Sequence, residues 1–342
     1  MRPTALVVVG ASAGGVEALR ALVARLPANL EAAVLVVLHT AREGPSALPK
    51  ILSRVSPLPA KHAVDGEALK AGHIYVAPPD HHLLVLDGRL RLSRGPAENG
   101  HRPSVDPLFR SAARVSGPRT VAVVLSGSRD DGTAGAAVVM EHGGRVLVQD
   151  PDDALHPSMP RSVIEFVGAH VVCPATELGT AVVEAVALVR ASHGTPERPP
   201  EDSELIALET AMANLENLDA ADLPGKPAAL ACPTCHGGLF ELPREPNPRY
   251  RCWVGHAWSP RSLLEEQGTA FEGALWMALR SLEEKASLAR QMGAAADRRG
   301  SPGAAERYRH ASAEAEHAGR LIRELIEQLG TLTTAPDVDL TH

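Results

Sequence analysis

Residues 6–15 read Leu6-Val7-Val8-Val9-Gly10-Ala11-Ser12-Ala13-Gly14-Gly15. A β-branched run ends at a glycine, a serine follows between small residues, and an amphipathic helical pattern begins at Val16. This is a G-x-S-x-G sequence on a predicted strand-to-helix turn, which exposes a serine hydroxyl above the sheet edge. The N–H groups of Ala13 and Gly14 are expected at a helix N-terminus, where they favour a negative oxygen. The stretch therefore predicts a nucleophilic serine.

A dinucleotide-binding turn is the alternative interpretation of the same residues. Gly10, Ser12 and Gly15 occupy the glycine positions of G-x-G-x-x-G, but the serine would block close approach of a pyrophosphate. The next apolar run ends in His39, where such a fold places an Asp or Glu for the ribose. The pattern thus favours the nucleophile over the nucleotide site.

Composition bounds the class of protein. The chain has 342 residues, 44% apolar and 22% charged, which allows one large domain and a smaller one. A net charge of −7 gives no basic footprint for nucleic acid. No apolar run is long enough for membrane insertion and no signal-peptide pattern opens the chain, so we expect a cytoplasmic protein.

Residues 4–190 alternate short apolar runs with helical patterns. Continuous apolar strands interleaved with helices predict an α/β fold with a doubly wound, mostly parallel sheet, Rossmann-like and three-layered. Asp87-Gly88 between two apolar runs predicts a hairpin. Predicted strands lie near 5–9, 33–38, 73–77, 120–126, 145–149 and 169–173, and predicted helices near 14–26, 44–54, 105–115, 132–141 and 175–191.

The remainder of the chain divides by composition. A catalytic domain is expected over 1–192, a proline-rich linker and amphipathic helix over 193–229, a Cys/His module over 230–258, an α-helical hairpin over 259–330 and a tail over 331–342. In the amphipathic helix, the 3-4-3 spacing predicts an apolar seam that needs a partner surface, formed by Leu205, Leu208, Met212 and Leu215.

A serine nucleophile needs a base and a group that orients the base. His39 ends the second predicted strand, and Asp130 and Asp131 follow the strand that ends near Ser126. The carboxyl ends of parallel strands meet at one sheet edge, so Ser12, His39 and one of these aspartates are expected together there. The pattern disfavours an α/β-hydrolase, because in that fold the nucleophile follows several strands and the acid precedes the histidine.

An ordered set of motifs resembles the catalytic domain of the CheB chemoreceptor methylesterases over about residues 4–190. The motifs are Val9–Gly15, Leu38-His39-Thr40, Ile74–Asp80, Arg102-Pro103-Ser104-Val105-Asp106, Leu125–Gly132 and Met159-Pro160. The resemblance implies that Ser12 is the nucleophile, His39 the general base and Asp131 the orienting acid. It further implies hydrolysis of glutamate γ-methyl esters on the cytoplasmic helices of chemoreceptors, with deamidation of receptor glutamines in some members.

The resemblance also implies an oxyanion and substrate region. Candidate residues are Ala13, Gly14, Ser128, Arg102, Ser104 and Asp106, although Ser104 could instead cap the helix that follows. His81 and His82 are expected at the surface. Two departures stand out. Ser126-Gly127-Ser128-Arg129 replaces the usual Thr-Gly-Met-Gly. We also expect no receiver domain before the catalytic domain, so gating is expected to be absent or to come from the tail.

The Cys/His module has the spacing of a zinc site. Cys232-x₂-Cys235 is followed by Cys252-x₃-His256, which supplies four ligands for tetrahedral zinc in a zinc-ribbon-like module. His236 competes as fourth ligand, but it adjoins Cys235. The alternative is a cluster of unmetallated thiols. We expect a structural metal and no cofactor for catalysis, because the serine chemistry needs none.

The sequence thus predicts a Ser-His-Asp esterase acting on methylated chemoreceptor helices. The C-terminal hairpin offers a surface for a helical partner or for self-association. Two other functions stay open: a non-catalytic signalling adaptor on the same fold, and a serine esterase or deamidase with a non-receptor substrate.

Overall fold

The computed structural model describes residues 3–191, 203–216, 225–243 and 248–332. Residues 193–202 and 217–224 of the predicted linker and helix segment (193–229), and residues 333–342 of the predicted tail, lie outside these ranges. The chain forms two compact units, residues 1–263 and residues 264–342.

A seven-stranded parallel sheet forms the centre of the first unit. Its order is β3-β4-β2-β1-β7-β8-β9, and every adjacent pair runs parallel. The strands are β1 (Ala5–Ala11), β2 (Ala32–Leu38), β3 (Ala60–His62), β4 (His73–Val76), β7 (Thr120–Val124), β8 (Arg145–Gln149) and β9 (Val171–Cys173). The doubly wound prediction is confirmed. Of the seven strands in this sheet, β3 alone was not predicted, because this three-residue edge strand is polar and carries no apolar run.

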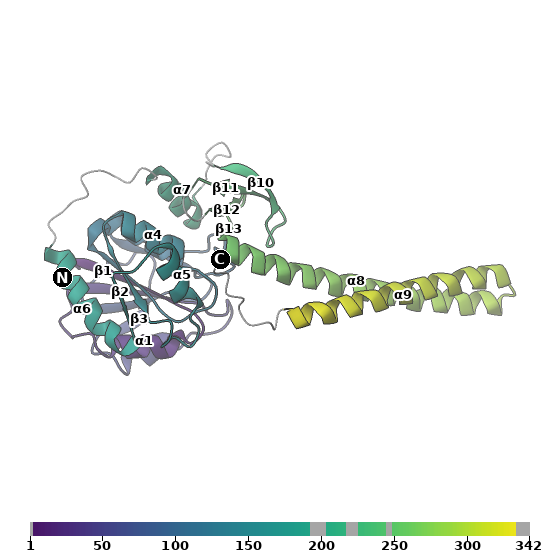
Figure 1. Cartoon of the computed structure of the whole chain (residues 1–342), viewed down its shortest axis with the longest axis horizontal. Coiled ribbons are helices and arrows are strands. Elements are labelled where there is room, and N and C mark those ends of the chain that lie inside the picture. Colours follow the sequence, from purple (N-terminus) through teal and green to yellow (C-terminus); the bar gives the residue numbers. More distant parts are fainter. Residues whose placement is uncertain (1–2, 192–202, 217–224, 244–247, 333–342) are drawn as a thin grey trace. The chain divides into compact units, whose positions relative to one another are not determined.

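Helices cover both faces of the sheet (Figure 1). One layer contains α1 (Gly15–Val23), α2 (Leu48–Ser53) and α6 (Ala175–Ala191). The other contains α3 (Val105–Ser116), α4 (Thr133–Glu141), α5 (Ser158–Phe166) and the hairpin of β5 (His82–Leu86) and β6 (Arg89–Ser93). A 3₁₀ turn, Gly117–Arg119, follows α3. The predicted Asp87-Gly88 turn is present, with φ 50° and 70°. The sequence missed α5 because Pro160 lies in its first turn, where a proline is tolerated.

The chain reverses its winding direction at β1. This strand pairs with β2 on one side and β7 on the other, so the loops after all three strands open at the same crevice. Backbone hydrogen bonds fix them there: Ser12 N–H donates to Ser126 O at 2.9 Å, and His39 N–H donates to Ala11 O at 3.0 Å. The topology therefore gathers the predicted nucleophile, base and acid.

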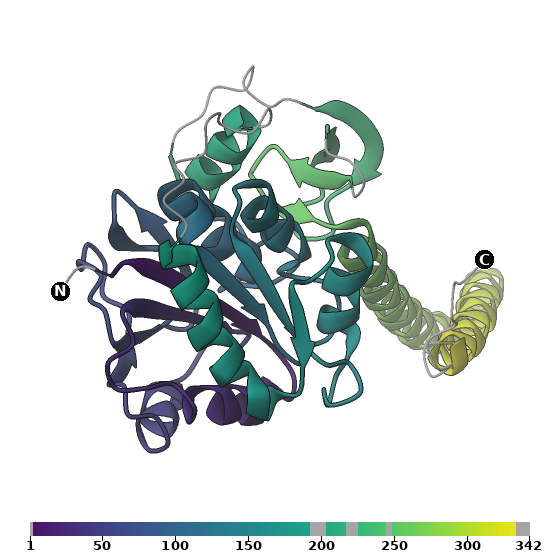
Figure 2. The ribbon, with the colours of Figure 1, turned by 60° about the vertical axis from the view of Figure 1, so that its left-hand side comes forward.

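A four-stranded antiparallel sheet and α7 complete the first unit (Figure 2). The strands are β10 (Lys226–Ala231), β11 (Gly238–Leu242), β12 (Arg249–Cys252) and β13 (Ala257–Trp258), and α7 spans Ser203–Ala213. Ile206 of α7 enters the core beside α3, where Leu205 and Met212 are also buried. Leu215 does not join the predicted seam: it lies beyond the helix with φ 60° and is 60% exposed.

The second unit is an antiparallel pair of long helices, α8 (Pro260–Arg298) and α9 (Pro302–Leu332). Buried residues along the hairpin include Leu279, Ala286, Ala289 and Ala296 of α8, and Ala305, Ser312 and Ala315 of α9. Their spacing of 7 and 3 residues is that of a coiled-coil seam, and the small side chains permit close helix packing. This confirms the predicted hairpin. Among the described helices, none combines the length and the apolar character that crossing a membrane requires.

Candidate active site and metal centre

Ser12, His39 and Asp131 lie in line at the crevice. Ser12 Oγ is 3.1 Å from His39 Nδ1, and His39 Nε2 is 2.7 Å from Asp131 Oδ2. Since an ionised carboxylate only accepts hydrogen bonds, the proton of the neutral imidazole belongs on Nε2. The lone pair on Nδ1 then faces the serine hydroxyl. The arrangement can deprotonate a serine during attack on a carbonyl carbon.

Asp131 is surrounded by hydrogen-bond donors. The carboxyl is 1% exposed and accepts hydrogen bonds from His39 Nε2, Asn99 Nδ2, Ser104 Oγ and the backbone N–H groups of Val105 and Asp106. Burial alone would raise the pKa of Asp131, but the hydrogen bond and charge of His39 outweigh it and lower that pKa below its usual range. Asp131 is therefore ionised when it orients the imidazole.

The turn around Ser12 presents free donors to the crevice. Gly14 caps α1 in the left-handed region, with φ 72°. Among the described residues, no group accepts a hydrogen bond from the N–H of Ala13 or Gly14. Both can therefore reach a developing oxyanion. Ser128, in the loop after β7, is exposed. Gly127 must lack a side chain, because a Cβ there would come within 2.1 Å of Met159 Sδ and 2.8 Å of Ser12 Cβ.

The other predicted groove residues occupy different positions. Ser104 is fully buried and donates to Asp131 instead of capping α3. Asp106 is 1% exposed and accepts from the N–H groups of Gly132 and Gly135. The prediction that Ser104 and Asp106 line the groove is therefore wrong, because neither reaches the surface.

The Arg102 side chain forms hydrogen bonds within the protein and does not point freely into the crevice as a groove residue would. Its guanidinium donates to Asp80 and to the carbonyl oxygens of Arg94 and Gly95, which braces the loop after β6. The expectation of a surface His82 is also wrong. This ring is 0% exposed, and its Nδ1 accepts from the N–H of Ser104.

Sequence reasoning missed two residues that contact the triad. The Asn99 amide donates to Asp131 at 3.0 Å, and the His101 ring stacks on the His39 ring. Both lie in the loop after β6, which carries no hydrophobic periodicity. The sequence signal that could have indicated Asn99 and His101 is their position just before the motif that begins at Arg102.

The structure brings together the four predicted metal ligands, Cys232, Cys235, Cys252 and His256, with all ligand atoms within 4.8 Å of one another. Cys235 Sγ lies 3.6 Å from Cys252 Sγ, and His256 Nδ1 lies 3.8 Å from Cys232 Sγ. Zinc–sulfur bonds of about 2.3 Å in a tetrahedron separate sulfur atoms by about 3.7 Å, so this donor set fits zinc. His236 does not belong to this cluster.

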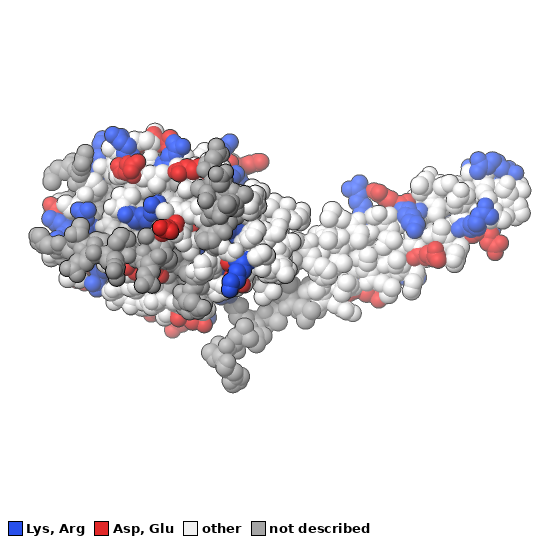
Figure 3. Space-filling view, turned by 90° about the horizontal axis from the view of Figure 1, so that it is seen from above, with Lys and Arg blue, Asp and Glu red and all other residues white. Residues whose placement is uncertain are grey.

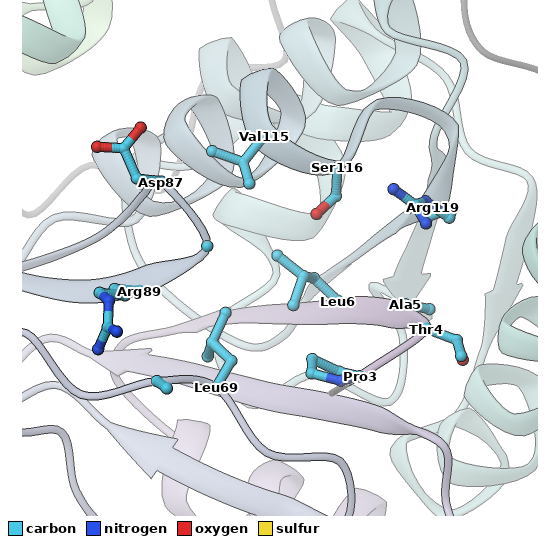
Figure 4. Close-up of a pocket in the computed structure, with 12 residues that line it drawn as sticks. Pro3, Thr4, Ala5, Leu6, Leu69, Asp87, Arg89, Val115, Ser116 and Arg119 are labelled. Atoms are coloured by element: carbon cyan, nitrogen blue, oxygen red, sulfur yellow. The ribbon is translucent and has the colours of Figure 1, made fainter. Parts of the chain in front are cut away.

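A separate pocket lies at the amino end of β1 (Figure 4). Leu6, Leu69, Arg89 and Val115 are among the residues that line it. Ser12 follows the carboxyl end of the same seven-residue strand, about 23 Å away at the usual rise per residue. The pocket therefore contributes nothing to the serine site.

Comparisons with known proteins agree with the fold and the site. The family model for CheB methylesterase matches residues 7–182. The chain is 40% identical over 181 residues to protein-glutamate methylesterase/protein-glutamine glutaminase 4 of Myxococcus xanthus, covering 53% of this chain and 51% of the relative. It is 36% identical over 186 residues to protein-glutamate methylesterase/protein-glutamine glutaminase 2 of Methanosarcina mazei, covering 52% and 51%.

A solved structure shares the fold of the first unit. The Thermotoga maritima CheB methylesterase catalytic domain is 36% identical, has a TM-score of 0.51, and is matched over 97% of its own length and 53% of this chain. An α/β domain of this kind, with this family match, defines the class: the chain belongs to the CheB methylesterase family. The chain spans about half the length of the curated relatives it matches.

Proposed function

We propose that this chain hydrolyses γ-methyl esters of glutamate residues on the cytoplasmic helices of chemoreceptors, and deamidates receptor glutamines by the same route. The observation that carries the proposal is the line of Ser12, His39 and Asp131. The names of the relatives, protein-glutamate methylesterase/protein-glutamine glutaminase, support the same substrate class.

The reaction runs through an acyl-enzyme. Ser12 Oγ attacks the γ-carbonyl carbon while His39 Nδ1 takes the hydroxyl proton, and the carbonyl oxygen becomes an oxyanion. The tetrahedral intermediate collapses, the ester C–O bond breaks, and His39 returns the proton to the leaving methoxide, which departs as methanol. Water then attacks the acyl carbon, and glutamate and free Ser12 are released. With glutamine the leaving group is ammonia.

Ala13 and Gly14 supply the oxyanion contacts in this proposal. Their N–H groups lie at the N-terminus of α1, where the helix dipole favours negative charge. Asp131 stays ionised throughout. It holds the imidazole tautomer and stabilises the imidazolium that forms after proton transfer.

Methanol release from a methylated receptor fragment tests the function. Wild-type protein should release methanol, Ser12→Ala should not, and Ser128→Ala, a matched change of an exposed serine in the same crevice, should lose at most about tenfold. A non-catalytic adaptor would bind the fragment without releasing methanol from any variant. A serine hydrolase with another substrate would cleave a small ester in a Ser12-dependent manner but leave the receptor fragment methylated.

A structural zinc ion is the cofactor we propose. Cys232, Cys235, Cys252 and His256 would fill all four positions of a tetrahedral site, which leaves no position for water activation. Zinc would hold together the turn before β11 and the end of β12, a region with only a small apolar core.

The α8–α9 hairpin is proposed to bind a helical partner or a second copy. Large apolar side chains are exposed on it, including Leu264, Phe271, Met277, Leu321 and Leu325. Figure 3 shows stretches of its visible face without charged side chains, whereas acidic and basic groups intermingle on the visible face of the first unit. Light scattering of the full chain, alone and with the receptor fragment, distinguishes self-association from partner binding.

A further inference from the structure

Asn99 lies between the triad acid and the Cys/His module. It is 2% exposed and has φ 52°. Its side-chain amide has two hydrogens and uses both: one is donated to Asp131 Oδ1 and one to Asp106 Oδ2, each at 3.0 Å. One amide therefore holds two neighbouring carboxyl groups apart and in place.

Two further polar groups of Asn99 are bound by the last strand of the module and by the residue that precedes α8. Its backbone N–H donates to Ala257 O at 2.7 Å, and its Oδ1 accepts from the backbone N–H of Ser259 at 3.0 Å. Ala257 directly follows His256, one of the four clustered ligands. The chain from the cluster to the triad acid is thus His256, Ala257, Asn99 and Asp131, with one hydrogen bond on each side of Asn99.

We propose that Asn99 is a positioning residue for the triad acid, and that the Cys/His module acts on the catalytic serine by holding Asn99 in place. The inference rests on the proposed function.

A buried ion cluster ties the module to the same loop. Arg249 of β12 donates to Asp106 and Glu98, and Arg251 donates to Glu98 and Glu209. With Arg110 the cluster contains three guanidinium and three carboxyl groups, all at most 3% exposed. Displacement of β12 would remove two of the three cations, and a buried charge without its partner is strongly destabilising. The module is therefore expected to dock as a whole or not at all.

A second contact reaches the residue beside the triad acid. Ser259 Oγ and Ser262 Oγ both donate to Asp130 Oδ1, at 2.8 and 2.7 Å. The start of α8 thus holds the backbone on the N-terminal side of Asp131, while β13 holds Asn99. Both contacts place the carboxylate that orients His39.

Loss of the Asn99 amide has a definite chemical consequence. Asp131 and Asp106 would face each other without their shared donor. Burial raises the pKa of Asp106 to about 7, against the opposing charge of Arg249. Removing a donor makes both carboxyl groups easier to protonate and strengthens the pull of Asp131 on the His39 proton. Either change moves the acidic limb of the pH–rate profile to higher pH.

The groups that face this pair come from every adjoining element. They are His39, His82, Glu98, His101, Arg110, Arg129, Asp130, Glu209, Arg249 and Arg251. Asn99→Gly and its control below leave all of these groups unchanged.

Asn99→Gly is the most direct variant, because glycine adopts φ 52° without strain while removing the amide. In the full chain it should lower kcat about 10- to 100-fold with KM changed less than about threefold, as expected for loss of orientation. The acidic limb of kcat/KM should rise by about half a pH unit or more. Asn99→Asp, which puts a third carboxyl beside Asp106 and Asp131, should move it further.

Val182→Ala is the matched control. Val182 is fully buried in α6 on the opposite face of the sheet. Its truncation should lower thermal stability yet leave the acidic limb in place. A limb shift shared by Asn99→Gly and Val182→Ala would indicate general destabilisation and overturn the positioning role.

Hydrogen exchange tests the module side without any variant. Zinc-loaded protein and protein treated with a chelator are compared over residues 97–101, followed by re-addition of zinc chloride. Removal should speed exchange of this segment about tenfold or more, and re-addition should restore protection. Unchanged protection overturns the link, even if catalysis has not been measured. Methanol release from neither wild type nor variants would defeat the proposed function instead, and the exchange result would still decide the link.

Discussion

The imidazole ring of His101 stacks on that of His39, with ring centroids 3.7 Å apart and planes within 13°. Burial and the adjacent charge of His39 lower the pKa of His101 to about 3. His101 therefore stays neutral when His39 takes the proton of Ser12, and the stack survives without repulsion between like charges. One face of the base is thus fixed by a ring that does not titrate with it.

We expect His101→Ala to lower kcat about tenfold, because the His39 ring loses the surface that limits its rotation. His101→Phe should retain most activity, since a phenyl ring preserves the stacked contact. Steady-state methanol release gives both values. Equal losses in the two variants would show that the ring nitrogens of His101, and not its face, are what the site requires.

Substitutions within the triad should be strongly non-additive. Ser12→Ala and His39→Ala should each lower kcat about 10⁶-fold, and Asp131→Asn about 10⁴-fold, because the last disturbs orientation and not bond making. The double variant Ser12→Ala/His39→Ala should lose little beyond either single one. Single-turnover measurements on methylated receptor check this series, and additive losses would contradict a shared proton transfer.

Sequence patterns predicted the parts of the molecule that repeat a period or carry a motif. Buried parallel strands such as β1 and β2 are continuous apolar runs, and the serine turn and His39 are fixed by the ends of those runs. Asn99 and His101 escaped prediction because they lie in a loop whose position depends on β13, far along the chain. The burial of Arg249 and Arg251 was not predicted for a related reason. In a sequence, a buried arginine cannot be told from a surface arginine until its ion-pair partners are known.

Arg129 lies where the sequence departs from the family pattern, and its backbone explains why glycine is usual there. Its φ is 65°, in the left-handed region that favours glycine. Arg129→Gly should therefore raise the free energy of unfolding by about 0.5–1 kcal/mol. Relief of backbone strain stabilises the fold, and the greater conformational freedom of glycine in the unfolded chain offsets part of that gain. Urea denaturation measures it, with Arg119→Gly as an arginine control. A loss of receptor turnover alongside the gain in stability would assign the Arg129 side chain to substrate binding.

The fold should lose stability as pH falls below about 6.5. Burial lowers the pKa of His82. Burial and the charge of His39 lower the pKa of His101 to about 3. A histidine in the unfolded chain titrates near 6.5. Between these values the unfolded chain binds a proton that the folded chain does not. Stability therefore falls with pH, by about 1.4 kcal/mol per pH unit for each such histidine. The raised pKa of Asp106 acts in the opposite direction and offsets part of this fall.

The lowered pKa of Asp131 acts in the same direction, but at lower pH. Its contribution is complete above the unfolded value near 3.9 and is lost as pH falls further. Urea midpoints at pH 7, 6 and 5 test the histidine effect. His101→Gln should reduce the slope over that range, and a midpoint independent of pH from 7 to 5 would contradict it.

One zinc ion per chain is expected in protein made with zinc present, measured by elemental analysis. Cys232→Ser and Cys252→Ser should lose the metal, whereas His236→Ala and Cys173→Ser, changes of the same kinds outside the cluster, should keep it. Trp258 reports the structural effect. It is fully buried and its Nε1 donates to Cys232 Sγ, while Trp253 and Trp276 are already about half exposed. Removing zinc should therefore shift tryptophan emission to the red, and a metal-free preparation with native emission would refute the structural role.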